Sequence, residues 1–280
     1  MIHEQVDLAR WKTEFSLERL RRDAREFVLN RREQMPDRYP DEAAVERHVR
    51  LLEPDGGIVE SAKQLAITEQ LREEANIPES WERIAADVFT MVNGEAPTRE
   101  MTKIGGLPFW PSGRDWPTFI TGEPMTFIGQ FCFGDSDDLV GLLPGDVLII
   151  FGIDHDSILG EEESAIHFSW INRGVSELIS AEEQHESSWK IAPYYGQIYR
   201  TYDLTEVHQN LTRYRGSEKL AVMEGTKIGG LPRWIQQAPQ MPGRFLCALG
   251  GTDDLDWGDA GSLYVFVTED GELHWTVQCY

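Results

Sequence analysis

The amino-acid sequence predicts an α+β fold, in which N-terminal helices pack on a β-rich, internally duplicated, roll-like body. Apolar residues recur at helical spacing up to about residue 95. Short β-branched and aromatic runs, separated by Gly, Pro and Asp, follow from residue 96. The seven residues TKIGGLP occur twice, at 102–108 and again at 226–232. We therefore expect an N-terminal helical region over residues 1–95 and a duplicated β-rich domain over residues 96–280.

The helical region divides into four expected helices. Apolar residues from Trp11 to Val28 recur mostly every three to five residues, with charged residues between them, which predicts one amphipathic helix that Pro36 and Pro40 end. Further helices are expected at 41–52, 59–75 and 78–92. The last of these would stop at Asn93-Gly94, a typical helix end.

The repeat extends beyond the TKIGGLP stretch. SDDL at 136–139 recurs as TDDL at 252–255, and VLIIF at 147–151 resembles LYVFV at 263–267. A Ser or Thr followed by two Asp predicts a helix N-cap with carboxylates in the first turn. A duplication explains this order, with residues 154–225 as an insertion between the copies. Residues that the copies share are then expected to be structural, and residues special to one copy are better functional candidates.

Several of these motifs together resemble one protein family. KIGGLPFWPSGRDWP, GEPMTFIGQF, LPGDVLIIF, the second KIGGLP, DWGDAG and HWTVQCY occur in the order found in the YwqG-like family of bacterial proteins. The resemblance covers roughly residues 96–280 and implies a β-rich, roll-like α+β fold with internal duplication. It implies no particular activity, catalytic residue or cofactor.

The composition restricts the partners of this protein. With 26 basic and 48 acidic side chains, the formal net charge is −22. Such a surface repels nucleic-acid phosphates and anionic lipids, so we expect no direct binding to nucleic acid or membranes and a partner with a basic surface. The sequence begins without a signal-peptide pattern, and Cys132, Cys247 and Cys279 are far apart and odd in number. These features predict a reduced, cytoplasmic location with small buried thiols. The sequence does not determine the oligomeric state.

The glycine pair of KIGGLP has two interpretations. Leu-Pro follows the glycines where a phosphate loop needs Lys-Ser or Lys-Thr at a helix start, so a structural turn is favoured. The alternative is an anion site that contains Lys103 and Lys227. Arg114 and Trp116, on the longer loop of the first copy, would complete this ligand site.

No catalytic motif, cofactor motif or metal-binding spacing is present in the sequence. Histidines lack HExxH spacing, and no Ser or Cys lies in a GxSxG pattern. The acidic stretch TDDLDWGDAG does not have the spacing of a calcium loop. Asp256 and Asp259, which have no counterpart in the first copy, are the only weak metal candidates that we retain.

Aromatic residues suggest a second kind of surface. Tryptophan and tyrosine are common at binding hot spots, and the stretch SSWKIAPYYGQIYRTYDL is rich in both. Trp189, Tyr194, Tyr195 and Tyr199 are therefore the candidate partner-binding residues.

Two functional hypotheses follow. The first is a non-catalytic cytosolic interaction protein, for example an immunity-type protein that masks a basic toxin. The second is a small-ligand-binding protein or enzyme with a pocket between the two KIGGLP repeats.

Overall fold

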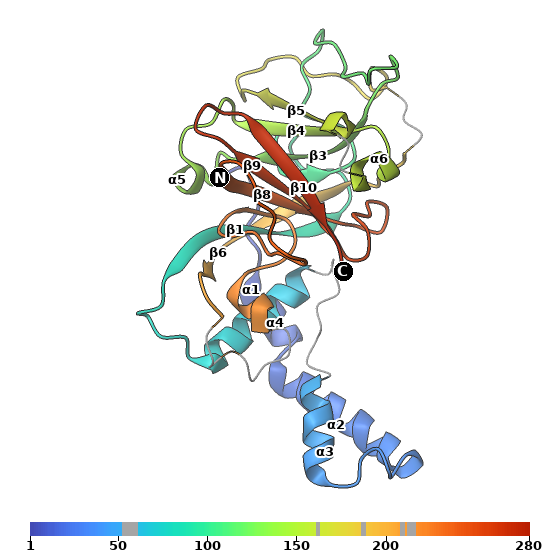
Figure 1. Ribbon diagram of the computed structural model, residues 1–280, viewed down its shortest axis with the longest axis vertical. Helices are drawn as coiled ribbons and strands as arrows, with labels where there is room; N and C mark the ends of the chain where they lie inside the picture. The colour runs from blue at the N-terminus through green and yellow to red at the C-terminus, as the bar shows by residue number, and fades with distance from the viewer. Residues whose placement is uncertain (52–60, 161–162, 186–188, 208–210, 212–216) are drawn as a thin grey trace.

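A computed structural model describes residues 1–51, 61–160, 163–185, 189–207, 211 and 217–280 of the chain (Figure 1). Short helices alternate with the strands after an N-terminal helical part. The elements are α1 (Leu8–Glu14), α2 (Leu17–Gln34), α3 (Glu42–Leu51), α4 (Ser61–Ala75), β1 (Arg83–Asn93), β2 (Lys103–Ile104), β3 (Thr126–Cys132), α5 (Asp137–Val140), β4 (Val147–Gly152), α6 (His155–Leu159), β5 (Ile166–Ile171), β6 (Tyr194–Leu204), α7 (Ser217–Ala221), β7 (Lys227–Gly229), β8 (Arg244–Gly250), β9 (Ser262–Val267) and β10 (Leu273–Gln278).

The strands form one ten-stranded, nearly closed antiparallel sheet in the order β10-β9-β8-β7-β1-β6-β2-β3-β4-β5. Its centre is the ladder between the two long strands β1 and β6, which runs from the Arg83–Leu204 pair to the Asn93–Tyr194 pair. The other edge of β1 pairs with β7, and the other edge of β6 pairs with β2. Each long strand therefore connects the two halves of the sheet.

The largest hydrophobic cluster lies inside the curved sheet. It combines residues of both halves, such as Ile104, Phe131 and Leu148 with Ile228 and Leu249, all of them fully buried. Strands β3, β4 and β9 are buried along their whole length. This explains why their sequences are continuous apolar runs without the polar alternation of a half-exposed strand.

Helices α1 to α4 lie at one end of the molecule, whereas α5 and α6 lie beside the sheet (Figure 1). Helix α4 packs on β1 and contacts α1 and α7, whereas the α2–α3 pair extends away from the sheet. The buried Arg72 of α4 donates hydrogen bonds to Leu220 O at 2.8 Å and to Thr201 Oγ1 at 3.0 Å, which ties α4 to α7 and β6. In the described part of the chain, no helix has both the length and the apolar character that crossing a bilayer requires.

Several sequence expectations about these elements are wrong. Residues 78–92 do not form a helix, because 83–93 is strand β1, whose middle is buried between two partner strands. The expected first helix is two helices, and Ser16 caps the second by accepting a hydrogen bond from Arg19 N at 3.3 Å. Residues 154–225 are not an insertion outside the repeated body, because β5 and the central strand β6 lie within them.

The two DDL motifs form different local structures. In the first, Ser136 precedes the short helix α5, but its hydroxyl donates to Asp87 Oδ2 at 2.6 Å and does not cap the helix. In the second, Thr252 Oγ1 accepts a hydrogen bond from Leu255 N at 3.1 Å in a turn that is not helical. The expectation of two helix caps is therefore wrong, since tertiary contacts decide the use of each hydroxyl. Cys132 and Cys247 are buried free thiols, as expected, whereas the free thiol Cys279 is only half-buried.

We expect the shared core to carry much of the stability. Leu249→Ala should lower the free energy of unfolding by about 2–5 kcal/mol, because it removes a fully buried side chain and leaves a cavity. Urea denaturation measures this loss. Leu142→Ala, the same change at a fully exposed leucine, is the control; similar effects for both variants would contradict the assigned core.

Candidate functional site

The two KIGGLP stretches form the same local turn. In each, the lysine belongs to a short strand, and two glycines with positive φ follow: +60° and +68° at Gly105 and Gly106, and +68° at both Gly229 and Gly230. This left-handed backbone favours glycine, and the following Leu-Pro returns the chain to extended geometry. The expected glycine turn with positive φ is therefore present in both copies.

The lysine of the second copy forms a buried ion pair. Lys227 Nζ lies 2.7 Å from Asp203 Oδ2, and both side chains are fully buried. Asp203 also accepts hydrogen bonds from Leu231 N at 2.8 Å and, through Oδ1, from Met223 N at 2.7 Å. Burial lowers the pKa of Lys227, and the attraction of Asp203 opposes this shift. The carboxylate thus satisfies three donors around the turn.

The lysine of the first copy has no such partner in the part of the chain that the structure describes. Lys103 is 2% exposed, and its Nζ donates to the carbonyl oxygen of Leu107. Within the described residues, no carboxylate oxygen lies at ion-pair distance from Lys103. Burial lowers the pKa of Lys103 to about 7; the nearby Arg99 adds to this shift and Glu95 opposes it. Two identical sequence stretches therefore hold lysines in different electrostatic states.

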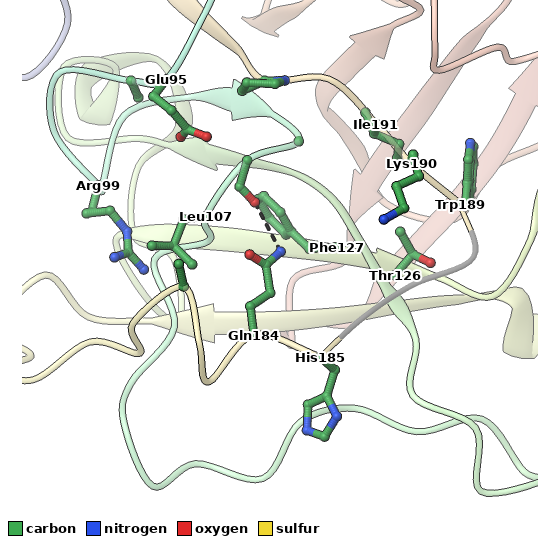
Figure 2. Close-up of a pocket in the computed structure, with 15 residues that line it drawn as sticks. Glu95, Arg99, Leu107, Thr126, Phe127, Gln184, His185, Trp189, Lys190 and Ile191 are labelled. Carbon is green, nitrogen blue, oxygen red and sulfur yellow. Dashed lines mark hydrogen bonds between the residues drawn. The ribbon is translucent and has the colours of Figure 1, made fainter.

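A pocket of about 640 Å³ opens beside the first turn (Figure 2). This volume is in the range of small-molecule binding sites. Arg99 and Glu95 lie on one side of the pocket and Trp189, Lys190 and Ile191 on the other, with Gln184 between them. The complete lining is Glu95, Ala96, Arg99, Gly105, Gly106, Leu107, Thr126, Phe127, Ala181, Gln184, His185, Trp189, Lys190, Ile191 and Pro193.

Arg99 is held rigidly in the pocket wall. Its guanidinium donates to Ile179 O at 3.1 Å and to the carbonyl oxygen of Pro108, while its buried Nε has no hydrogen-bond partner among the described residues. Burial lowers the pKa of Arg99, and Glu95 opposes the shift. Arg99 and the buried Lys103 thus bring two basic groups to one side of a protein whose net charge is −22. Such a concentration of donors favours an anionic ligand.

Comparison with known proteins gives a family but no activity. A family model for a domain of unknown function (DUF1963) matches residues 102–273, more than half of the chain. The chain belongs to the DUF1963 family. No curated protein matches it. The matched range begins at the first KIGGLP, so it leaves out β1, although β1 lies at the centre of the sheet.

The structure separates the four ligand-site residues that the sequence suggested. Lys103 is close in sequence to the pocket residues Gly105 to Leu107. The ring centroid of Trp116 lies 5.5 Å from that of the pocket residue His185. Arg114 is exposed and lies over the Trp110 ring. Lys227 forms a buried ion pair with Asp203. This pocket, which residues before the matched DUF1963 range also line, therefore lies beside one KIGGLP turn.

The four candidate partner-binding aromatics lie in different surroundings. Trp189 forms part of the pocket wall and donates a hydrogen bond to Asp254 O at 3.3 Å. Tyr194 is buried in the central cluster, and Tyr199 packs on the cluster around Val88. Tyr195 is half-buried at the pairing of β6 with β2.

The weak metal candidates are exposed and do not converge with other ligands. Asp256 and Asp259 are on the surface. Among the residues that the structure describes, no group of three or more His, Cys, Asp or Glu side chains is placed to hold a metal ion.

Sequence reasoning missed Glu95, Arg99 and Gln184 of the pocket and Asp203, the partner of Lys227. These residues lie outside the repeated motifs, so the comparison of the two copies did not select them. One signal was present: an aspartate in a strand with many apolar or aromatic residues, such as Asp87 in β1 or Asp203 in β6, needs a partner for its charge if it is buried. Asp203 has Lys227, and Asp87 of β1 forms an ion pair with Arg200.

The buried ion pair should be essential to stability. Asp203→Asn should lower the free energy of unfolding by about 3 kcal/mol or more, because it leaves the buried Lys227 without its counter-charge. Urea denaturation of this variant and of the double variant Asp203→Asn, Lys227→Met measures the effect. The double variant should regain part of the loss. If it is as unstable as the sum of both single changes, the ion pair does not explain the effect.

The first-copy lysine should make stability depend on pH. Between about pH 7 and 10.5 an unfolded lysine binds a proton that the buried Lys103 does not. The unfolded state then carries more protons, so the free energy of unfolding should rise as the pH rises through this window. Lys103→Met should lose part of this rise in urea titrations at pH 7 to 10; the remainder comes from Lys227, whose pKa is also lowered by burial. Lys190→Met, at an exposed lysine of the same pocket, is the control and should retain it.

Proposed function

We propose that this DUF1963 protein binds a small anionic ligand in the pocket beside the first KIGGLP turn. The observation that carries the proposal is the placement of Lys103, a buried lysine without a carboxylate partner in the described part of the chain, next to a pocket of about 640 Å³. The identical lysine of the second copy has a carboxylate partner and therefore provides an internal comparison.

The lining supports a ligand with both charged and apolar parts. Arg99 and the exposed Lys190 supply positive charge, whereas Phe127, Trp189 and Ile191 supply apolar contact area. Binding sites for small molecules commonly combine an apolar wall with a few placed polar groups. Ligand binding is therefore the function that the site supports best, with or without a later chemical step.

We also propose that the sheet is a duplication of a five-strand unit, β1–β5 and β6–β10, as the YwqG-like resemblance implies. The strand order supports this, because each long strand pairs with the KIG strand of the other unit. In addition, the register shifts after Phe127 in β3 and after Phe245 in β8. Val147 pairs with the last residue of β3, and Ser262 pairs with the last residue of β8, so these two residues are equivalent in the proposed duplication. The sequence comparison instead matched Val147 with Leu263, one residue later.

The first sequence hypothesis, an immunity-type protein that masks a basic toxin, stays a prediction. It depends on the net charge of −22 and on aromatic residues expected to form one surface. Tyr194 and Tyr199 pack in two different clusters, so the favoured function is ligand binding.

A thermal-shift screen tests the ligand-binding proposal. A ligand at about ten times its Kd stabilises the folded state by about 1.4 kcal/mol, which raises the Tm by about 3 °C or more. We expect such shifts from small organic anions. Ala181→Trp, at an exposed position of the pocket lining, should remove them because the larger ring fills the entrance.

Ala9→Trp, at an exposed position of α1, is the matched control and should leave the shifts unchanged. The proposal is wrong if no anion stabilises the wild-type protein, or if Ala181→Trp retains every shift.

A further inference from the structure

The second KIGGLP turn already binds a carboxylate that belongs to the chain itself. Asp203 reaches it from β6 and receives hydrogen bonds from Lys227 Nζ at 2.7 Å and from Leu231 N at 2.8 Å. A carboxylate oxygen of Asp203 also comes so close to the turn that a Cβ on Gly230 would lie 2.2 Å from it. Lysine, turn amide and glycine thus form one carboxylate-binding unit.

The first turn has the same donors but no aspartate at that position. Lys227 pairs with Val88 of β1, and Lys103 pairs with Tyr195 of β6, so Val88 and Tyr195 are equivalent positions. Asp203 follows Tyr195 by the same number of residues as Ala96 follows Val88. Ala96 is therefore the residue of the first copy that corresponds to Asp203. Ala96 is a small residue that lines the pocket.

Two turn amides of the first copy lack an acceptor among the described residues. Within the described residues, neither Gly106 N nor Leu107 N donates a hydrogen bond, whereas Leu231 N, the counterpart of Leu107 N, binds Asp203. Lys103 Nζ instead donates to Leu107 O. A lysine and turn amides without a carboxylate partner among the described residues are suited to bind an external acceptor at this pocket wall.

Glu95 is the internal carboxylate nearest to this position. A Cβ on Gly106 would lie 2.7 Å from its Oε2, so the side chain covers the turn. The Glu95 side chain is exposed, however, and within the described residues it forms no ion pair with Lys103. A long exposed side chain that is not held by hydrogen bonds can move aside when a ligand enters.

We propose that the first KIGGLP turn binds the carboxylate of a ligand in the way that the second binds Asp203. The ligand carboxylate accepts hydrogen bonds from Leu107 N and Lys103 Nζ, and its apolar part lies against Phe127, Trp189 and Ile191. This inference rests on the proposed ligand-binding function and adds the chemical class: a carboxylate attached to an apolar body. A free carboxylic acid and the C-terminus of a peptide share this chemistry.

Calorimetric titration with matched probes tests the proposal. We expect 3-phenylpropanoate to bind at least about tenfold more tightly than 3-phenylpropanamide, because only the acid provides a charged acceptor. N-acetyl-Ala-Phe with a free C-terminus, compared with its C-terminal amide, distinguishes a peptide source: tighter binding than 3-phenylpropanoate indicates a peptide, and weaker binding indicates a free acid.

Ala96→Asp tests the site through the internal comparison. The new aspartate should occupy the carboxylate position as Asp203 does, and so weaken 3-phenylpropanoate binding at least about tenfold. Its presence should also raise the Tm, because Lys103 gains a counter-charge. Ala96→Asn, of the same size but neutral, should not raise the Tm.

The outcomes separate this inference from the proposed function. Equal binding of acid and amide, lost in Ala181→Trp, overturns the carboxylate assignment and leaves ligand binding intact. Unchanged acid binding in Ala96→Asp also overturns the assignment. Failure of every anion in the screen and of both probes to bind the wild-type protein overturns the proposed function as well.

Discussion

The antiparallel ladder between β1 and β6 is the contact on which the rest of the structure depends. It joins segments that are far apart in the chain, Arg83–Asn93 and Tyr194–Leu204, along their full length. Strand β1 also pairs with β7, which follows β6 in sequence, and β6 also pairs with β2, which follows β1. Neither half of the sheet is thus complete without a strand from the other, and the shared core between the halves forms only when both are present.

Two lysines, Lys103 and Lys227, are buried in this fold, and their charges are costly to bury. An unpaired buried charge is strongly unfavourable, so a lysine there either finds a carboxylate or loses its proton. Lys227 has a carboxylate partner in Asp203, whereas the pKa of Lys103 falls to about 7, so Lys103 gives up its proton more easily than an ordinary lysine. The same peptide sequence thereby serves a closed, structural role in one copy and borders an open pocket in the other.

Much of the strand content could be predicted from the sequence, because the apolar runs of β3, β4 and β9 are buried on both faces. Strand β1 could not, since RIAADVFTMVN follows helical segments and has no strict alternation. Its extended conformation results from pairing with β6 and β7, which local propensity does not contain. For the same reason β6 was mistaken for part of an insertion.

The sequence by itself determined the glycine turns, the acidic surface, most helices and the repetition of KIGGLP, because these depend on local backbone preference and composition. Only the tertiary structure decided which lysine has a carboxylate partner and where the pocket opens. The reason is distance along the chain: Asp203 reaches Lys227 from another strand, and Arg99 and Trp189 reach the first turn from separate segments. Two identical stretches differ in chemistry because their non-local neighbours differ.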